Sequence, residues 1–506
     1  MFRVQRIGRE TVMKRKSGIL LPVASLPGKY GIGSFSKEAY KFIDYLKEAG
    51  QSYWQILPLG PTGYGDSPYQ SFSTFAGNPY FIDLDTLIEE GLLKKSEVSK
   101  YDFGSNALYI DYEKIWLSRF KVLKIAYERS GVEKKAAYKK FVKENAFWLD
   151  DYALYMAVKN SFGGVSFIEW DEDIRLRKPE AIKKYTKELK DEIGFYKFQQ
   201  FKFNEQWNKL KTYANKNGIK IIGDIPIYVA FDSADTWANP QLFKFDKNGL
   251  PTGVAGCPPD GFSATGQLWG NPLYDWKYHK KTGFAWWIER IRNCYKLYDV
   301  IRIDHFRGFD EYYNIPYGDP TAEFGKWEKG PGIALFKTLK QELGEMDIIA
   351  EDLGFLTDTV LKLVKDTGYP GMKVLQFAFD SREDSDYLPH NYSKNCVVYT
   401  GTHDNNTVKG WYDELSKADK KFAIRYLDNE KTDVEEIHWD YIRLAMGSVA
   451  NLCVIPVQDY LGLSKEARIN TPATLGDNWK WRMSEKALTK SLAKKIYDIT
   501  KLYARI

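Results

Sequence analysis

The chain has 506 residues, a formal net charge of +6 and 44% hydrophobic residues, which excludes a wholly disordered protein and allows a large core. No stretch approaches the roughly 18 consecutive apolar residues of a membrane span, and the composition excludes collagen-like, coiled-coil and disulfide-stapled chains. At about 150 residues per domain, the length suggests about three domains, although one elaborated α/β barrel also reaches this size.

Residues 1–16 form a basic extension. They hold six basic side chains and one acidic side chain, so they carry +5 and the rest of the chain carries +1. The body is therefore nearly neutral, and we expect no nucleic-acid partner. The extension has no apolar segment of the secretory kind. We interpret it as a segment that precedes a second start at Met13 and lies outside the fold; an organelle transit peptide is the alternative.

Neither the cysteines nor the histidines are spaced like metal ligands. The four cysteines, Cys257, Cys294, Cys396 and Cys453, form no Cys-x-x-Cys pair. We expect them to be reduced thiols in a cytoplasmic protein. The five histidines form no His-x-x-x-His pair, so we expect no metal site.

Eight short apolar runs recur along the chain, and most of them end in Gly, Pro or an acidic residue. They are residues 18–23, 53–59, 219–225, 298–303, 347–350, 372–379, 396–399 and 452–457. Most are continuous rather than alternating, which is typical of strands that are buried on both faces of a parallel sheet.

Helical patterns lie between these runs. In the first one, Ala39, Phe42, Ile43 and Leu46 recur with helical spacing. Ser36 before it and Gly50 after it are suitable end signals. Eight strands that alternate with helices predict a (β/α)8 barrel. A doubly wound open sheet is the alternative, but the Gly-x-Gly-x-x-Gly turn that such a sheet often carries after an early strand is missing.

Two gaps are too long for one strand and one helix. The first, from 59 to 219, predicts an inserted, mainly helical subdomain at about 85–200. The second, from 228 to 298, contains a segment rich in Gly, Pro and aromatic residues at 251–276, which we expect to be a loop. We expect residues 17–506 to form one elaborated catalytic barrel.

Carboxylates stand at the ends of five predicted strands, where barrel enzymes carry their active sites. They are Asp224, Asp304, Glu351, Asp404 and Asp459. A single strand-end Asp often only caps the next helix. Several of them on one rim favour a catalytic interpretation.

The clearest local signal is Arg302-Ile303-Asp304. Alternation along a strand places Arg302 and Asp304 on one face, where the guanidinium would keep Asp304 ionised. A structural ion pair is the alternative. Glu351 ends the next strand, and carboxylates at matched height on neighbouring strands lie roughly 5 Å apart, as a retaining glycosidase requires. Alternation alone does not decide between Glu351 and Asp352.

Aromatic residues cluster in the loops beyond the strands. Residues 64–69 (YGDSPY) follow the second run, and Phe262, Trp269, Tyr274 and Trp276 follow the third. Aromatic faces beside polar groups suit sugars. Core packing is the alternative, although the surrounding Gly, Pro and Asn indicate loops.

The chain closely resembles the 4-alpha-glucanotransferases of the amylomaltase type, glycoside hydrolase family 77. The matching runs are residues 25–28 (SLPG), 30–33 (YGIG), 55–70 (QILPLGPTGYGDSPYQ), 223–226 (GDIP), 256–260 (GCPPD), 268–272 (LWGNP), 302–308 (RIDHFRG), 350–354 (AEDLG) and 402–405 (THDN). The resemblance extends from about Ser17 to Trp481.

The resemblance implies a role for each matched residue. Asp304 is similar to the nucleophile, Glu351 to the general acid/base, and Asp404 to the third carboxylate, which holds two sugar hydroxyls. The other implied substrate-binding residues are Tyr69, Asp224, Arg302, His403, Asp260, Trp269, Ser67 and Tyr64. The family also implies that the loop at about 251–276, which holds Asp260 and Trp269, covers the active-site cleft. It implies no cofactor and no metal.

The implied activity is the transfer of α-1,4-glucan segments between maltooligosaccharides by a retaining double displacement. An α-amylase-type hydrolase with the same carboxylates is the nearest alternative. A glucan-binding protein with an inactive site is another, but the intact trio of carboxylates argues against it. We expect a monomer or weak homo-oligomer with no membrane partner.

Overall fold

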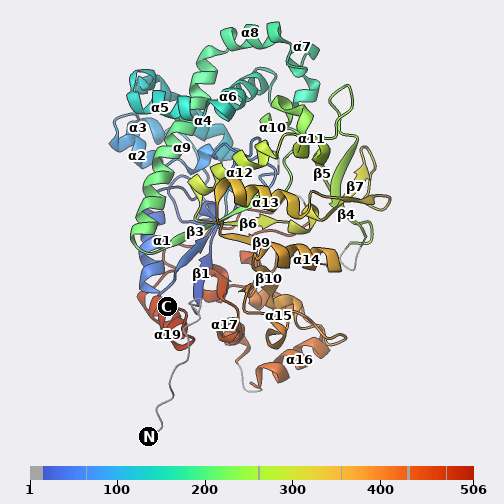
Figure 1. Cartoon of the computed structure of the whole chain (residues 1–506). Coiled ribbons are helices and arrows are strands. Elements are labelled where there is room, and N and C mark those ends of the chain that lie inside the picture. Colours follow the sequence, from blue (N-terminus) through green and yellow to red (C-terminus); the bar gives the residue numbers. More distant parts are fainter. Residues whose placement is uncertain (1–14, 64, 260–262, 355, 430–432, 475) are drawn as a thin grey trace.

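Eight parallel strands form a nearly closed barrel in the computed structural model, which describes residues 15–63, 65–259, 263–354, 356–429, 433–474 and 476–506. Neighbouring strands follow the order β10, β11, β12, β1, β2, β3, β6, β9, and helices surround them (Figure 1). Their bounds are β1 (Lys16–Leu20), β2 (Tyr53–Gln55), β3 (Lys220–Pro226), β6 (Val300–Asp304), β9 (Ile348–Ala350), β10 (Gly371–Val374), β11 (Cys396–Tyr399) and β12 (Leu452–Pro456). The expected (β/α)8 fold is confirmed.

The apolar runs form strands for the expected reason. Every residue of β9 and of β11 is buried, as a strand covered on both faces requires. Six strands are shorter than their runs, β2 and β10 most of all. The run 372–379 leaves the sheet after Val374, which pairs with Tyr399, the last residue of β11. Leu375–Phe377 then form a 3-10 helix instead.

The helices around the barrel also follow their sequence signals. Helix α1 (Lys37–Glu48) begins after Ser36, whose hydroxyl accepts from the N–H of Glu38, and Gly50 after it has a φ of +69°. Both end signals are therefore confirmed. The other helices outside the long insertion are α10 (Ala234–Ala238), α11 (Trp276–Lys281), α12 (Ala285–Leu297), α13 (Ile333–Leu343), α14 (Asp358–Thr367), α15 (Val408–Glu414), α16 (Lys417–Leu427), α17 (Ile437–Gly447), α18 (Val457–Tyr460) and α19 (Lys490–Leu502).

The long segment between β2 and β3 is helical and groups at one side of the barrel in Figure 1. Its helices are α2 (Leu84–Glu89), α3 (Lys95–Val98), α4 (Tyr112–Ser130), α5 (Ala136–Glu144), α6 (Ala146–Ser161), α7 (Glu172–Arg175), α8 (Pro179–Glu188) and α9 (Lys190–Lys216). Helix α9 returns the chain to β3. Its Gln200 and Gln206 bond the backbone at Gly77 and Asp83, so the insertion is attached to the segment after β2.

A second sheet stands beside the barrel. It is antiparallel, in the order β5, β4, β7, β8, with β4 (Gly253–Cys257), β5 (Gln267–Pro272), β7 (Glu311–Pro316) and β8 (Lys326–Lys329). The segment 251–276 is therefore not an irregular loop as expected, because two of its stretches pair with each other and β4 also pairs with β7.

Arg15 and Lys16 belong to the packed structure. Lys16 pairs with Leu452 in the barrel, and the Arg15 guanidinium donates to the carbonyls of Tyr503, Met446 and Ser448. The packed fold thus includes at least two residues of the segment 1–16, which was expected to lie outside it. Residues 1–14 lie outside the described part of the chain.

Candidate active site

The carboxyl ends of β3, β6 and β9 place three carboxylates on one rim. Asp224 pairs with Arg302 across β3 and β6, and Ile303 pairs with Ala350 across β6 and β9. Asp304 and Glu351 come directly after this last pair, and the Glu351 N–H still donates to the Ile303 carbonyl at 3.0 Å. The two carboxylates therefore stand at matched height on neighbouring strands.

Arg302 connects Asp224 to Asp304. Its side chain is only 3% exposed, and one of its terminal nitrogens lies 2.7 and 2.6 Å from the two oxygens of Asp224, which is fully buried. Its other terminal nitrogen lies 3.1 Å from Asp304 Oδ1. Arg302 Nε donates to Met372 Sδ at 3.3 Å. With its nitrogens held in this way, the guanidinium has one orientation, and it orients Asp304.

Backbone N–H groups hold Glu351. His305 N donates to Oε2 at 2.6 Å, and Leu353 N donates to Oε1 at 2.8 Å. His305 has a φ of 50°, a left-handed conformation that non-glycine residues seldom adopt. This turn directly after Asp304 aims an N–H at the second carboxylate, so the backbone itself connects the two acids.

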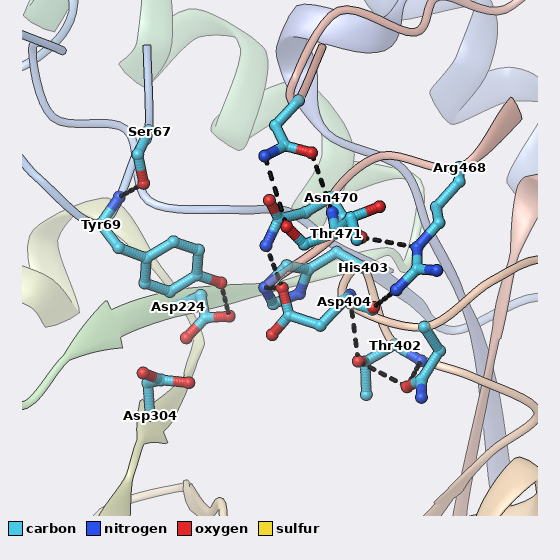
Figure 2. A network of polar contacts seen from close by, with 12 residues as sticks. Ser67, Tyr69, Asp224, Asp304, Thr402, His403, Asp404, Arg468, Asn470 and Thr471 are labelled. Atoms are coloured by element: carbon cyan, nitrogen blue, oxygen red, sulfur yellow. Dashed lines mark hydrogen bonds and ion pairs between the residues drawn. The ribbon is translucent and has the colours of Figure 1, made fainter. Parts of the chain in front are cut away.

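Asp404 follows β11 and receives its partners from the segment after β12. Asn470 Nδ2 donates to Asp404 Oδ1 at 2.6 Å, and His403 Nε2 lies 3.3 Å from the same oxygen. Arg468 donates to the backbone carbonyl of Asp404 at 2.7 Å. Figure 2 shows this group facing Tyr69, Asp224 and Asp304.

Tyr69 connects the two sides of the site. Its hydroxyl donates to Asp224 Oδ2 at 2.9 Å, and its ring is stacked on His403, with centroids 5.2 Å apart (Figure 2). Trp479 contacts both rings at 5.9 and 6.0 Å. Ser67 accepts a hydrogen bond from Tyr69 N at 3.3 Å, so it helps to place the tyrosine.

Trp269 approaches the site from the second sheet. Its ring meets the ring of His305 edge to face, with centroids 4.8 Å apart, and His305 directly follows Asp304 in the chain. The structure thus brings nine of the eleven expected site residues to this rim or its immediate neighbours. The other two, Tyr64 and Asp260, lie outside the described residues.

Burial governs the protonation of these groups. It raises the pKa of Asp304 well above the usual range, and the charge of Glu351 adds to this rise, while Arg302 opposes it. Arg302 was expected to keep Asp304 ionised; the ion pair exists, but burial outweighs it. Burial also raises the pKa of Glu351, against Arg302 and the two N–H donors. Such a pair releases its two protons in coupled steps, so it retains one proton at a pH where an isolated carboxyl has lost it.

Burial shifts the pKa of His403 in the opposite direction. Burial lowers its pKa, and the neighbouring Asp404 only partly offsets this. The imidazole is therefore neutral near pH 7 and has one N–H to donate.

Asp459, the fifth strand-end carboxylate, is structural. Its oxygens accept from Thr400 Oγ1 at 2.6 Å and from the N–H of Val408, the first residue of α15, at 2.8 Å. The residues that sequence reasoning did not assign are Asn470, Arg468, Met372 and Trp479. Asn470 and Trp479 lie in an Asn-Thr-Pro and a Trp-Lys-Trp run of the C-terminal segment, the only local signals of their importance.

The described ranges contain no group of three or more His, Cys, Asp and Glu side chains placed to hold a metal ion. Among the described helices, none is long and apolar enough to cross a membrane.

Comparison with known proteins identifies the family. A protein family described as 4-alpha-glucanotransferase matches residues 21–489. A 4-alpha-glucanotransferase from Clostridium butyricum is 53% identical over 485 residues, which are 96% of this chain and 99% of that protein. One from Thermus thermophilus is 47% identical, covering 93% and 95%. An amylomaltase from Streptococcus agalactiae, solved in complex with acarbose, has a TM-score of 0.94 and 42% identity, covering 97% and 100%. The chain therefore belongs to the 4-alpha-glucanotransferase family.

Proposed function

We propose that Asp304 and Glu351 perform the glucan transfer of this family as the nucleophile and the general acid/base. The observation that carries this proposal is the register of β6 and β9, which ends the two strands at matched height with a carboxylate on each. The spacing of neighbouring strands, about 4.8 Å, suits a retaining mechanism, in which one carboxylate attacks and the other moves the proton.

The reaction proceeds in two displacements. In the first, Glu351 protonates the glycosidic oxygen while Asp304 attacks the anomeric carbon, and the reducing-end part of the donor leaves. In the second, Glu351 removes the proton from the 4-hydroxyl of an acceptor sugar, which displaces Asp304. The raised pKa of Glu351 supports this role, because a general acid must still hold its proton near neutral pH.

The other residues at the rim position the sugar. Asn470 and His403 both contact Asp404 Oδ1, so we assign Asp404 Oδ2 to the 2- and 3-hydroxyls of the sugar that reacts. The single N–H of the neutral His403, on Nε2 beside Asp404 Oδ1, is shared with a hydroxyl of the sugar. Tyr69 offers its ring to the sugar, while Asp224 and Arg302 orient Asp304 beneath it.

Transfer requires that water be excluded from the glycosyl-enzyme. The segment 251–276 is the part of the chain that we assign to this task, because Trp269 on β5 reaches the ring of His305. We assign further glucan contacts to Ser67, Tyr64 and Asp260. We also propose that the helical segment at about 85–200 is a subdomain inserted in a single catalytic barrel, and that residues 1–14 take no part in the reaction.

The setting of the protein is part of the same proposal. Cys294, Cys396 and Cys453 are buried thiols, and burial raises their pKa to between about 11 and about 12, which suits a reducing compartment. We propose a cytoplasmic enzyme, a monomer or weak homo-oligomer. Its partners are α-1,4-glucans and maltooligosaccharides, and it uses no cofactor, nucleic acid or membrane.

Incubation with maltotriose tests the activity. We expect glucose and a ladder of longer glucans, with no rise in the number of reducing ends. A steady rise in reducing ends would instead indicate the α-amylase-type hydrolase. For the residue roles, Asp304→Asn should abolish transfer while glucan binding, measured by calorimetry, is retained; an active Asp304→Asn enzyme would refute the assignment of the nucleophile.

A further inference from the structure

The barrel has a seam between β9 and β10. Among the described residues no strand ladder joins these two strands, which lie at the two ends of the sheet order and side by side in Figure 1. One backbone bond crosses the seam, from the N–H of Ala350 at the end of β9 to the carbonyl of Pro370 just before β10, at 2.9 Å. Glu351 follows β9 directly, so the proposed acid/base stands at the least hydrogen-bonded edge of the barrel.

A side chain takes the place of the next ladder bond. Asp352 Oδ1 accepts from the N–H of Met372 in β10 at 2.7 Å. The chain makes room for this carboxylate, because a Cβ on Gly371 would lie 2.2 Å from Asp352 Oδ2. Asp352 therefore joins the end of β9 to β10 at the height of the active site.

Met372 also connects Asp352 to Asp304, the other member of the catalytic pair, by way of Arg302. The Sδ of Met372 accepts from Arg302 Nε at 3.3 Å, and Arg302 in turn lies 3.1 Å from Asp304. We propose that Asp352 is a positioning residue that closes the seam between β9 and β10 and so holds Glu351 and the Arg302–Asp304 pair in their relative positions. This inference rests on the proposed role of Glu351 as the acid/base.

The charge of Asp352 also acts on its neighbour. The titratable groups that face Glu351 are Arg302 and Asp304 from β6, Asp352 from its own segment and Tyr387. Lys373 of β10 and Tyr387 also face Asp352. The negative charge of Asp352 raises the pKa of Glu351, whereas Arg302 lowers it. Asp352 thus has one structural effect and one electrostatic effect on the acid/base, and two substitutions separate them.

Asp352→Asn retains an oxygen for the Met372 N–H and removes the charge. We expect a melting temperature within about 3 °C of the wild type, a kcat for maltotriose disproportionation about tenfold lower, and an alkaline limb of the kcat/KM profile about half a pH unit lower. Asp352→Ala also removes the bond across the seam. We expect its kcat to fall about a hundredfold with KM changed by less than about threefold, because the loss lies in the arrangement of the reacting groups.

Asp459→Asn is the matched control, because Asp459 is also a buried strand-end carboxylate with a backbone N–H donor but does not contact Glu351. Asp459→Asn should leave the alkaline limb of the kcat/KM pH profile unchanged. The proposal is overturned if both Asp352 variants keep the wild-type kcat and alkaline limb while Glu351→Gln is inactive, or if Asp459→Asn shifts the limb equally. An active Glu351→Gln enzyme would instead refute the proposed function itself. If Asp352→Ala does not fold, Asp352→Ser takes its place, because its shorter side chain also loses the bond to the Met372 N–H; a wild-type kcat in that variant would overturn the proposal.

Discussion

The two sides of the active site are held by different kinds of structure. Asp304 and Glu351 follow paired strands, and the partners of Glu351 are backbone N–H groups of His305 and Leu353. Asp404 and His403 both lie in the loop after β11. The main partner of Asp404 is Asn470, which lies 66 residues further along the chain. We call these the strand side and the loop side.

This difference suits the work of each side. Bond making and breaking depends on the distance between two carboxylates. Strand register places the backbones that carry them, and the buried Arg302 orients Asp304. Holding a sugar needs hydrogen bonds at several angles, which loops supply more easily. Substitutions on the strand side should therefore remove the chemistry, whereas those on the loop side should weaken it by degrees.

The largest effect is expected on the strand side. Asp304→Asn and Glu351→Gln keep the shape of each side chain but remove the nucleophile or the proton donor, so kcat should fall at least about a thousandfold. Quantifying glucose released from maltotriose checks this. Equal and small losses in both variants would place the catalytic pair elsewhere.

The strand side is also the part that sequence reasoning could identify. Continuous apolar runs that end in Asp224, Asp304 and Glu351 predicted both the barrel and its rim, because strand burial and strand-end chemistry are local properties. The second sheet was missed, because β4 (GVAGC) has few β-branched residues and its pairing with β7 joins distant segments. Asn470 and Met372 act only through tertiary contacts, and alternation along β9 left open which of Glu351 and Asp352 faces the substrate.

On the loop side, Asn470→Ala should have an intermediate effect. Loss of its bond leaves Asp404 with His403 alone on Oδ1, so the carboxylate is less well oriented, and we expect kcat/KM to fall about ten- to a hundredfold. Steady-state kinetics with maltotriose measures this. Asn208→Ala is the control, since the Asn208 side chain is exposed and bonds only Asn204 on the same helix. If the two variants have equal activity, Asn470 does not position Asp404.

Tyr69 contacts both sides, so its variants distinguish the contribution of the strand side from that of the loop side. Tyr69→Phe loses the bond to Asp224 but keeps the ring on His403, and Asp224 still has Arg302. A lost hydrogen bond of this kind costs about 1 kcal/mol, so kcat/KM should fall about fivefold. Tyr69→Leu also loses the ring contact and should be clearly worse. A Phe variant as inactive as the Leu variant would show that the hydroxyl, and therefore the strand side, dominates.

An effect on stability rather than on activity is expected beneath the loop side, where Asp459 joins Thr400 to Val408 on either side of Asp404. Burial raises the pKa of Asp459 to about 6, against about 3.9 in an unfolded chain. Between these values the folded protein binds more protons than the unfolded one, so this group lowers the free energy of unfolding as the pH rises, by at most about 3 kcal/mol. Asp459→Asn does not titrate, so from pH 4 to pH 7 its free energy of unfolding should decrease less than that of the wild type. Denaturant unfolding at several pH values measures both curves; parallel curves would mean that Asp459 titrates as an ordinary surface carboxyl and that the loop side has no buried charge beneath it.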